Sequence, residues 1–255
     1  MQAMDYLSML FRWFHIIWGI VWIGLLYFFN WVNGPFTATM DAETKKKVIP
    51  ELAPRALFWF RWGAAYTWIL GIFLLGLVYE NGTIYLSDPA SATGMSHILF
   101  FSFLIVPFIY DMLAKSALAK NPKVFAGLCF VLVAIIIYVL GNCCGFSYRG
   151  YVMYIGAMFG TTMAYNVWFR IWPNQKIIIN GVKTGVPADA GIVSTAGTRS
   201  KHNTYMSIPL VWTMINAHTV TLAGDYGWVW LVVVIFIGWM AANGIYKRAA
   251  KIKGF

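Results

Sequence analysis

Long apolar segments, separated by short polar stretches, dominate the pattern of hydrophobic and polar positions along this chain. A helix needs about 20 mostly apolar residues to cross a membrane. Seven segments meet this requirement, at about 7–29, 56–79, 96–114, 124–140, 151–172, 204–222 and 228–246. The pattern therefore predicts an all-α fold, a polytopic transmembrane helical bundle of about seven spans, with residues 1–255 as one transmembrane domain.

The sixth segment is the weakest of these predictions, because it contains Asn216, His218 and several threonines. Polar residues in a spanning helix usually face the bundle interior and not lipid. Between the fifth and sixth spans, the Gly-, Ala- and Thr-rich stretch 174–201 is typical of a loop. Residues 81–95 form a second, shorter loop on the opposite side.

Composition narrows the class of protein further. Of the 255 residues, 60% are hydrophobic and only 11% are charged, too few to cover a water-soluble surface. This excludes a soluble enzyme, a nucleic-acid-binding module and a disordered protein. Membrane lipid is therefore the first expected partner. Binding of nucleic acid is excluded as the reason for the net charge of +10, so this charge needs a different explanation.

The basic residues explain that charge, because they gather in alternate connections and in the tail. Seventeen of the 19 are Lys45, Lys46, Lys47, Arg55, Arg61, Lys115, Lys120, Lys123, Arg170, Lys176, Lys183, Arg199, Lys201, Lys247, Arg248, Lys251 and Lys253. The opposite side of the membrane receives only Arg12 and Arg149. Since cytoplasmic loops carry the excess of Lys and Arg, the N-terminus is predicted outside and the C-terminus in the cytoplasm. The expected location is a bacterial inner membrane.

Sequence motifs limit the cofactors that the chain can hold. Its three cysteines include no C-x-x-C-H, so no covalently attached haem is encoded, and they are too few to hold an iron–sulfur cluster. Neither a flavin nor a nicotinamide fingerprint is present. A cofactor, if bound, must be held by other side chains.

Histidines supply the candidate ligands. His15, His97 and His218 lie on three different predicted helices at similar depth in the outer half, and Tyr154 joins them. Facing helices of a bundle can each supply an axial ligand to a b-type haem. We therefore predict haem iron bound through His15 and His218, with His97 and Tyr154 as further candidates. The alternative is that these side chains only form hydrogen bonds between helices.

A second polar set lies toward the cytoplasmic side of the predicted bundle. It consists of Arg61, Asn166, Gln175, His202 and Asn203. Amide and cationic groups together can bind a planar, amide-rich anion through paired hydrogen bonds. Basic residues at this side can equally be membrane anchors, so a substrate-binding pocket is one interpretation and anchoring is the other.

Three segments resemble the membrane-bound urate hydroxylases, the family of the urate oxidase N-terminal membrane domain. Residues 11–24, FRWFHIIWGIVWIG, are similar to that family's first span. Residues 156–176, GAMFGTTMAYNVWFRIWPNQK, and residues 200–218, SKHNTYMSIPLVWTMINAH, are similar to its fifth and sixth spans. The resemblance covers most of the chain, and the last two segments are its most specific parts.

The resemblance implies oxidation of urate, with electrons passed to a c-type cytochrome and not to oxygen. It implies roles for the matching residues His15, Asn166, Pro173, Gln175, His202, Asn203 and His218. Tyr154 stands where the family commonly has a histidine, which places one ligand in doubt. Family members continue through an eighth span into an external cytochrome c domain, and this chain is expected to lack both.

These observations favour a haem b-containing membrane electron-transfer protein that oxidises urate or a related substrate, or passes electrons within a larger complex. A separate c-type cytochrome, or another haem subunit, is expected at the outer face. Two alternatives stay open. One is a non-catalytic accessory subunit of a respiratory or other energy-converting complex, and the other is a small-molecule transporter or channel.

Overall fold

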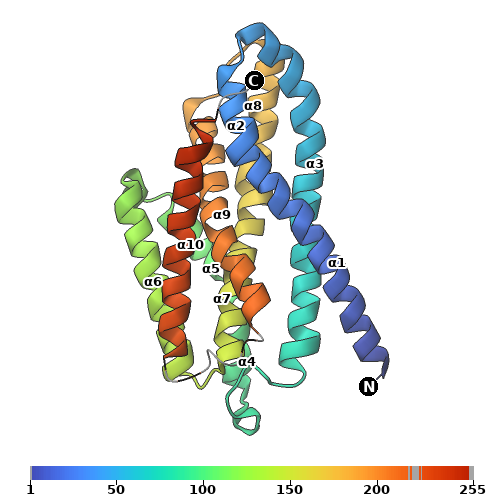
Figure 1. The fold of residues 1–255 in the computed structure, drawn as a ribbon, viewed down its shortest axis with the longest axis vertical. Coiled ribbons are helices and arrows are strands. Elements are labelled where there is room, and N and C mark those ends of the chain that lie inside the picture. Colours follow the sequence, from blue (N-terminus) through green and yellow to red (C-terminus); the bar gives the residue numbers. More distant parts are fainter. Residues whose placement is uncertain (1, 218, 220–223, 225, 253–255) are drawn as a thin grey trace. The chain divides into compact units, whose positions relative to one another are not determined.

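The structure is a computed structural model that describes residues 2–217, 219, 224 and 226–252, without the side chains of residues 2 and 3. Within these ranges the chain is built of helices and short connections (Figure 1). The one β-type pairing found there is an antiparallel bridge between Leu86 and Phe146. The predicted all-α fold is confirmed.

The helices differ widely in length and type. The α-helices are α1 (Gln2–Tyr27), α2 (Gly34–Thr39), α3 (Ala42–Leu74), α4 (Gly94–Phe101), α5 (Val106–Leu113), α6 (Pro122–Asn142), α7 (Tyr148–Asn166), α8 (Trp172–Thr184), α9 (Ala190–Asn216) and α10 (Gly227–Ala249). Three π-helical segments continue α-helices, namely η1 (Phe28–Asn33), η2 (Leu75–Glu80) and η6 (Val167–Ile171). Short 3₁₀ turns occur at η3 (Pro89–Ser91), η4 (Ser102–Leu104) and η5 (Ala117–Lys120).

Side chains at the helix starts show why the helices begin where they do. Asp41 precedes α3, and its carboxylate accepts hydrogen bonds from the backbone N–H groups of Glu43 and Thr44, both at 2.9 Å. Asn121 caps α6 in the same way, with Pro122 at the first helical position. These caps satisfy backbone donors that the first helical turn leaves without partners.

The predicted third span is bent rather than straight. α4 and α5 are separated by η4, and the two halves meet at 41°. Pro107 lies in the first turn of α5. Proline has no N–H and its ring crowds the preceding turn, so Pro107 favours a new helix start here, although α3 continues through Pro50 and Pro54 and α9 through Pro209.

The expected loop at 174–201 is wrong, because α8 and α9 occupy most of it and only residues 185–189 connect them. α8 ends at Gly185, whose φ of 79° lies in the left-handed region that favours glycine. Asp189 then begins α9 by accepting a hydrogen bond from the N–H of Gly191 at 2.7 Å. Local stop and start signals, and not the Gly- and Thr-rich composition, decide the structure here.

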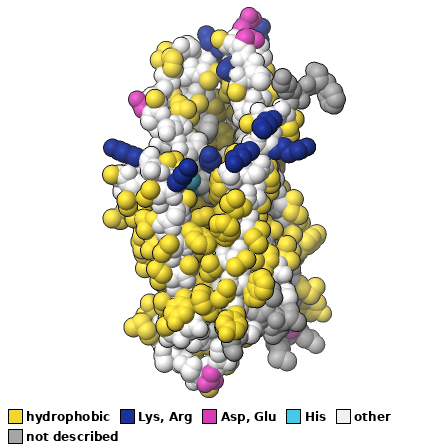
Figure 2. Space-filling model, turned by 60° about the vertical axis from the view of Figure 1, so that its left-hand side comes forward, with side chains coloured by type: hydrophobic (Ala, Val, Ile, Leu, Met, Phe, Trp, Pro, Cys, Tyr) yellow, Lys and Arg dark blue, Asp and Glu magenta, His cyan; other side chains and the backbone are white. Residues whose placement is uncertain are grey.

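Among the residues that the structure describes, four helical stretches are long and apolar enough to cross a membrane, and a fifth is added if the bent α4–α5 pair is one span. The four are Met4–Thr39, Ala42–Glu80, Pro122–Asn142 and Gly227–Ala249. Exposed hydrophobic side chains such as Ile20, Val131 and Phe236 lie on these stretches. Figure 2 shows how widely such side chains cover the face in view. The chain is thus a helical protein with several apolar helices suited to a membrane.

The chain divides into two compact units, which we describe separately. Unit 1 comprises Met1–Ser8, Ile72–Thr162 and Ile208–Trp239, and unit 2 comprises Met9–Gly71, Met163–Ser207 and Met240–Phe255. In unit 1 the core follows α7, where Val152, Ile155 and Met158 are buried. A Cβ added at Gly156 would lie 2.5 Å from the Thr213 hydroxyl of α9, so glycine is needed for this close contact.

Unit 2 has its own core around the contact between α1 and α3. Trp22 and Leu26 of α1 and Phe60 and Ala64 of α3 are buried there. A Cβ at Gly63 would stand 3.2 Å from the backbone nitrogen of Trp22, so the two helix backbones approach closely at this point. The predicted site residues Arg61, Asn166, Gln175, His202 and Asn203 all belong to this unit.

Candidate functional site

His15 is held at one of its two ring nitrogens by the neighbouring helix α3. Its Nδ1 lies 2.8 Å from the backbone carbonyl oxygen of Thr67 on α3. Because a carbonyl oxygen only accepts, Nδ1 carries the proton, and the lone pair of a neutral imidazole is then on Nε2. No described residue forms a hydrogen bond with Nε2. Ligating histidines commonly hold their second nitrogen in this way.

Small residues on α3 make room for this imidazole. A Cβ added at Gly71 would lie 3.0 Å from His15 Cε1, and the Thr67 hydroxyl donates back to the Gly63 carbonyl at 2.7 Å. Gly63, Thr67 and Gly71 are spaced four residues apart and therefore share one helix face. Sequence reasoning missed them as supports of His15, although this spacing of small residues is a recognisable signal of close helix packing.

His97, at the start of α4, is held by two polar partners within unit 1. Its Nδ1 lies 2.5 Å from a carboxylate oxygen of Glu80 and 3.0 Å from the Tyr85 hydroxyl. Tyr85 is fully buried and stacks on Phe100 at 4.4 Å between ring centroids. A carboxylate next to Nδ1 fixes the ring orientation, so His97 resembles His15 in having one nitrogen engaged.

Tyr154 of α7 also has a partner, because its hydroxyl lies 2.7 Å from the hydroxyl of Ser102. Phe103 and Phe146 contact its ring edge to face. The fourth candidate ligand, His218, lies outside the described residues. Since His15 belongs to unit 2 and His97 and Tyr154 to unit 1, a shared ligand set stays a prediction.

Asn166 and Asn203 are brought together, but by contact with each other. Asn166 Nδ2 donates to Asn203 Oδ1 at 2.9 Å, and Asn203 Nδ2 donates to the Met163 carbonyl at 3.0 Å. Both asparagines are completely buried. Asn203 thus uses both of its amide groups, and the pair joins the α7 segment to α9 within unit 2.

Arg61 lies in an aromatic setting. Its guanidinium carbon is 4.0 Å from the centroid of the Trp172 ring, the distance of a cation–π stack. The Trp168 indole N–H donates to the Arg61 carbonyl at 3.1 Å. Lys176 also approaches the Trp172 ring, at 5.5 Å. A planar cation on an indole, with a second cation nearby, can bind a flat anion.

His202 and Gln175 lie on two different helices of unit 2. Gln175 lies in the first turn of α8 and is half-buried. His202 lies on α9, two residues before the predicted sixth span. Burial, together with the positive charges of Arg199 and Lys201, lowers the pKa of His202 from 6.5 to about 4. His202 is therefore neutral at pH 7 and can act there as a proton acceptor.

A second polar contact in unit 2 was not predicted from the sequence. Asn30, in the π-helical segment η1, donates to the Ser200 hydroxyl at 2.8 Å and accepts from the Tyr246 hydroxyl at 2.8 Å. It therefore joins η1 to α9 and α10. An asparagine inside an apolar run is a sequence signal for such a contact.

The described part of the chain contains no cluster of side chains suited to bind a metal ion. It contains no group of three or more His, Cys, Asp or Glu side chains able to hold a metal ion. Cys129, Cys143 and Cys144 are free thiols.

Comparisons with known proteins identify a family. The family model described as urate oxidase N-terminal matches residues 39–251 of this chain. The match includes Thr67 and Gly71, the Arg61 stack and the Asn166–Asn203 pair. Neither a curated protein nor a solved structure matches the chain.

Proposed function

Since this chain belongs to the urate oxidase N-terminal family, we propose that it is a membrane oxidoreductase domain that takes electrons from urate or a related purine. The electrons pass through a b-type haem to a c-type cytochrome, or to another haem subunit, at the outer face. The single observation that carries this proposal is the geometry of His15. Its protonated Nδ1 is bound to Thr67, so its Nε2 is available to iron.

A bound b-type haem supplies a one-electron carrier inside the apolar bundle. His15 would hold the iron, and the Thr67 carbonyl keeps the imidazole in the tautomer that can ligate. Gly71 gives the ring its space, because any side chain there would press on Cε1. His218 is the proposed second ligand, and His97 and Tyr154 are the further candidates.

On the substrate side, Arg61 is the best supported of the five candidate residues. Its planar guanidinium, stacked on Trp172, offers charge and paired donors to a flat anion such as urate. Gln175 supplies amide groups from α8. His202, neutral at pH 7, is proposed as a hydrogen-bonding group for the substrate. Asn166 and Asn203 support this site by fixing α9 to the α7 segment.

The membrane arrangement is part of the same proposal. We place seven spans in a bacterial inner membrane, with the N-terminus outside and the C-terminus inside. The alternation of basic and non-basic connections supports this orientation. α7 and α9 are less apolar than the other proposed spans, which fits the burial of most α7 side chains, because such a helix need not face lipid. Reporter fusions within residues 83–93 and after Phe255 should report opposite sides.

The visible spectrum of the purified chain tests the proposed function directly. We expect a Soret band that shifts on chemical reduction, and a reduction of the same species by urate under anaerobic conditions. His15→Ala should remove the band. Absence of a haem spectrum in protein purified from haem-sufficient cells would reject the proposal.

The substrate site needs its own variants. Arg61→Lys keeps the charge but loses the planar stack, so urate should bind more weakly. Arg55→Lys is the matched control, because Arg55 is exposed and pairs with Glu51 on the same helix. Equal urate affinity in both variants would remove Arg61 from the site.

A second candidate function is a non-catalytic accessory subunit of a larger membrane complex. The observation that favours it is the Asn166–Asn203 pair, whose amides bind each other and so serve the packing of helices. A chain that holds haem but is not reduced by urate, and that purifies with other membrane subunits, would support this function.

A further inference from the structure

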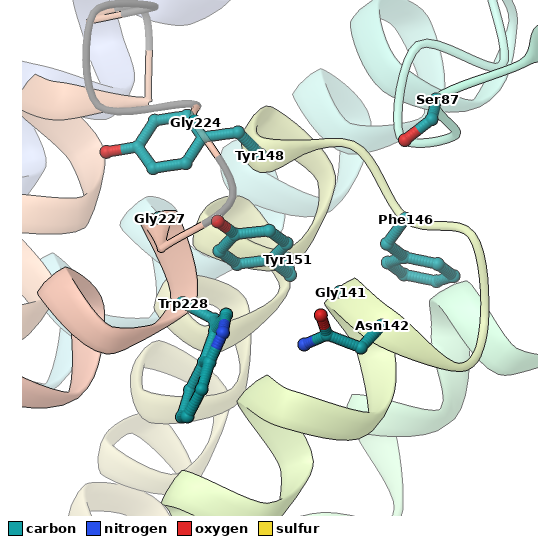
Figure 3. A pocket seen from close by; sticks show the side chains of 9 residues that line it. All are labelled: Ser87, Gly141, Asn142, Phe146, Tyr148, Tyr151, Gly224, Gly227 and Trp228. Atoms are coloured by element: carbon teal, nitrogen blue, oxygen red, sulfur yellow. The ribbon is translucent and has the colours of Figure 1, made fainter.

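Unit 1 contains a cavity that none of the proposed chemistry uses. It has a volume of about 510 Å³ and is lined by Ser87, Gly141, Asn142, Phe146, Tyr148, Tyr151, Gly224, Gly227 and Trp228. Figure 3 shows the rings of Phe146, Tyr148, Tyr151 and Trp228 and the Asn142 amide arranged around this space. The volume is in the range of pockets that bind small organic molecules, about 300–1,000 Å³.

One wall of the cavity is held in place by backbone pairing. The Ser87 N–H donates to the Gly145 carbonyl at 2.9 Å, and the Ser147 N–H donates to the Tyr85 carbonyl at 2.8 Å. A Cβ at Gly150 would come within 2.0 Å of that same carbonyl oxygen, so only glycine permits this contact. The wall is thus fixed by the chain itself, as in pockets that are formed before their ligand binds.

The side chains around the cavity are aromatic or neutral and polar. None of the lining residues that the structure describes is charged. Tyr151 is only 6% exposed, and its hydroxyl forms no hydrogen bond with any described residue. Asn142 donates to the Tyr138 carbonyl at 3.0 Å, which leaves its amide oxygen available as an acceptor. As lining groups of the cavity, the Tyr151 hydroxyl can donate a hydrogen bond to a ligand carbonyl and the Asn142 amide oxygen can accept one.

We propose that this cavity binds a neutral, planar ring with carbonyl oxygens at its edge, the chemistry of a quinone head group. The aromatic rings provide contact with the faces of such a ring, and Tyr151 donates to one of its carbonyl oxygens. The described lining residues offer no charge to compensate urate, which is an anion at neutral pH and would lose its hydration there. This inference goes beyond the proposed function and does not depend on haem.

Isothermal titration of the full chain in detergent tests the proposal with a benzoquinone that carries one five-carbon prenyl tail. The free prenyl alcohol and urate serve as comparison ligands. We expect saturable, one-to-one binding of the quinone, no saturable binding of the alcohol, and no displacement by urate. Tyr151→Phe should weaken quinone binding about three- to tenfold, the effect of losing one hydrogen bond.

Tyr226→Phe is the matched control, because Tyr226 is 74% exposed and does not line the cavity. If Tyr151→Phe fails to fold, Asn142→Ala provides a second variant, because Asn142 is exposed and tolerates substitution more readily. It should also weaken quinone binding, because the ligand loses its contact with the Asn142 side chain. Unchanged affinity in the folded variants, equal binding of the alcohol, or displacement by urate would each overturn the proposal. Loss of urate oxidation without loss of quinone binding would instead bear only on the proposed function.

Discussion

At the contact between α1 and α3, the His15 imidazole has one nitrogen bound to Thr67 and the other without a partner among the described residues. At the contact between the α7 segment and α9, Asn203 uses both amide groups, on Asn166 and on Met163. Both contacts lie in unit 2 and both place polar groups between apolar helices. The first leaves one imidazole nitrogen without a described partner, whereas at the second Asn203 has a partner for both of its amide groups.

The difference separates two uses of a buried polar side chain. A group whose hydrogen bonds are complete within the protein contributes to stability, because breaking one bond leaves its partner buried and unsatisfied. A group held firmly at one atom, with a second atom available, is prepared for a ligand. The comparison therefore predicts that substitutions at the two contacts affect different properties of the protein.

The largest expected effect is at His15. In His15→Ala the haem loses a proposed ligand, so we expect loss of most of the Soret absorbance measured per mole of purified protein. Thr67 lies inside α3 and the substitution removes only a side-chain contact to its carbonyl, so helical content measured by circular dichroism should stay the same. Retained Soret absorbance, with an unchanged maximum, would show that His15 is not a ligand. The α1–α3 contact would then not differ from the asparagine contact in its use.

The next effect is at Asn203. Asn203→Ala leaves Asn166 Nδ2 and the Met163 carbonyl without their present partners, and each unsatisfied group costs about 1–3 kcal/mol. We expect a lower midpoint of thermal or detergent-induced unfolding, with an unchanged Soret maximum. Asn180→Ala is the control, because Asn180 is exposed on α8. A changed spectrum with unchanged stability would mean that the pair serves the haem and not the packing.

A smaller, pH-dependent effect is expected from His202, the neighbour of Asn203. Its pKa is about 4 in the folded protein and about 6.5 in the unfolded chain, so the unfolded state binds more protons between these values. Stability is fully present above pH 6.5 and falls toward pH 4, by up to about 1.4 kcal/mol per pH unit. His202→Gln should flatten this part of the stability curve, measured as unfolding midpoint against pH. An equally steep curve in the variant would assign the acid sensitivity to other groups.

The sequence predicts the apolar helices of this protein better than the helices whose ends are set by caps and single residues. Hydropathy located α6 and α10 closely. The predicted spans 124–140 and 228–246 lie within the observed helices Pro122–Asn142 and Gly227–Ala249. It failed at 174–201, because helices outside the apolar spans are set by caps and packing and carry no hydropathy signal. It also did not foresee the bend before Pro107, which depends on a single residue.

The site was predictable in its residue types but not in its contacts. His15 was identified because an imidazole in an apolar span needs a partner. Its actual partner, the Thr67 carbonyl, is a backbone atom and leaves no trace in composition. Asn166 and Asn203 were chosen as substrate ligands from their amide chemistry, but that chemistry also suits them to bind each other. Spacing along one chain cannot distinguish these outcomes.

The smallest expected effect tests the space around His15. Gly71→Ala adds a Cβ about 3.0 Å from His15 Cε1, so the ring must move by a few tenths of an ångström while its bond to Thr67 strains. Crowding of this size costs about 1 kcal/mol, which corresponds to roughly a fivefold weaker haem affinity. Gly24→Ala is the control, since nothing lies within 4 Å of a Cβ placed there, and it should raise stability by about 0.5–1 kcal/mol through helix propensity. Haem titration of the two apoproteins measures the difference. If Gly71→Ala instead binds haem as tightly as Gly24→Ala, the His15 imidazole can move freely at the α1–α3 contact. A fixed orientation of this ring would then not be the property that distinguishes the contact from the Asn166–Asn203 pair.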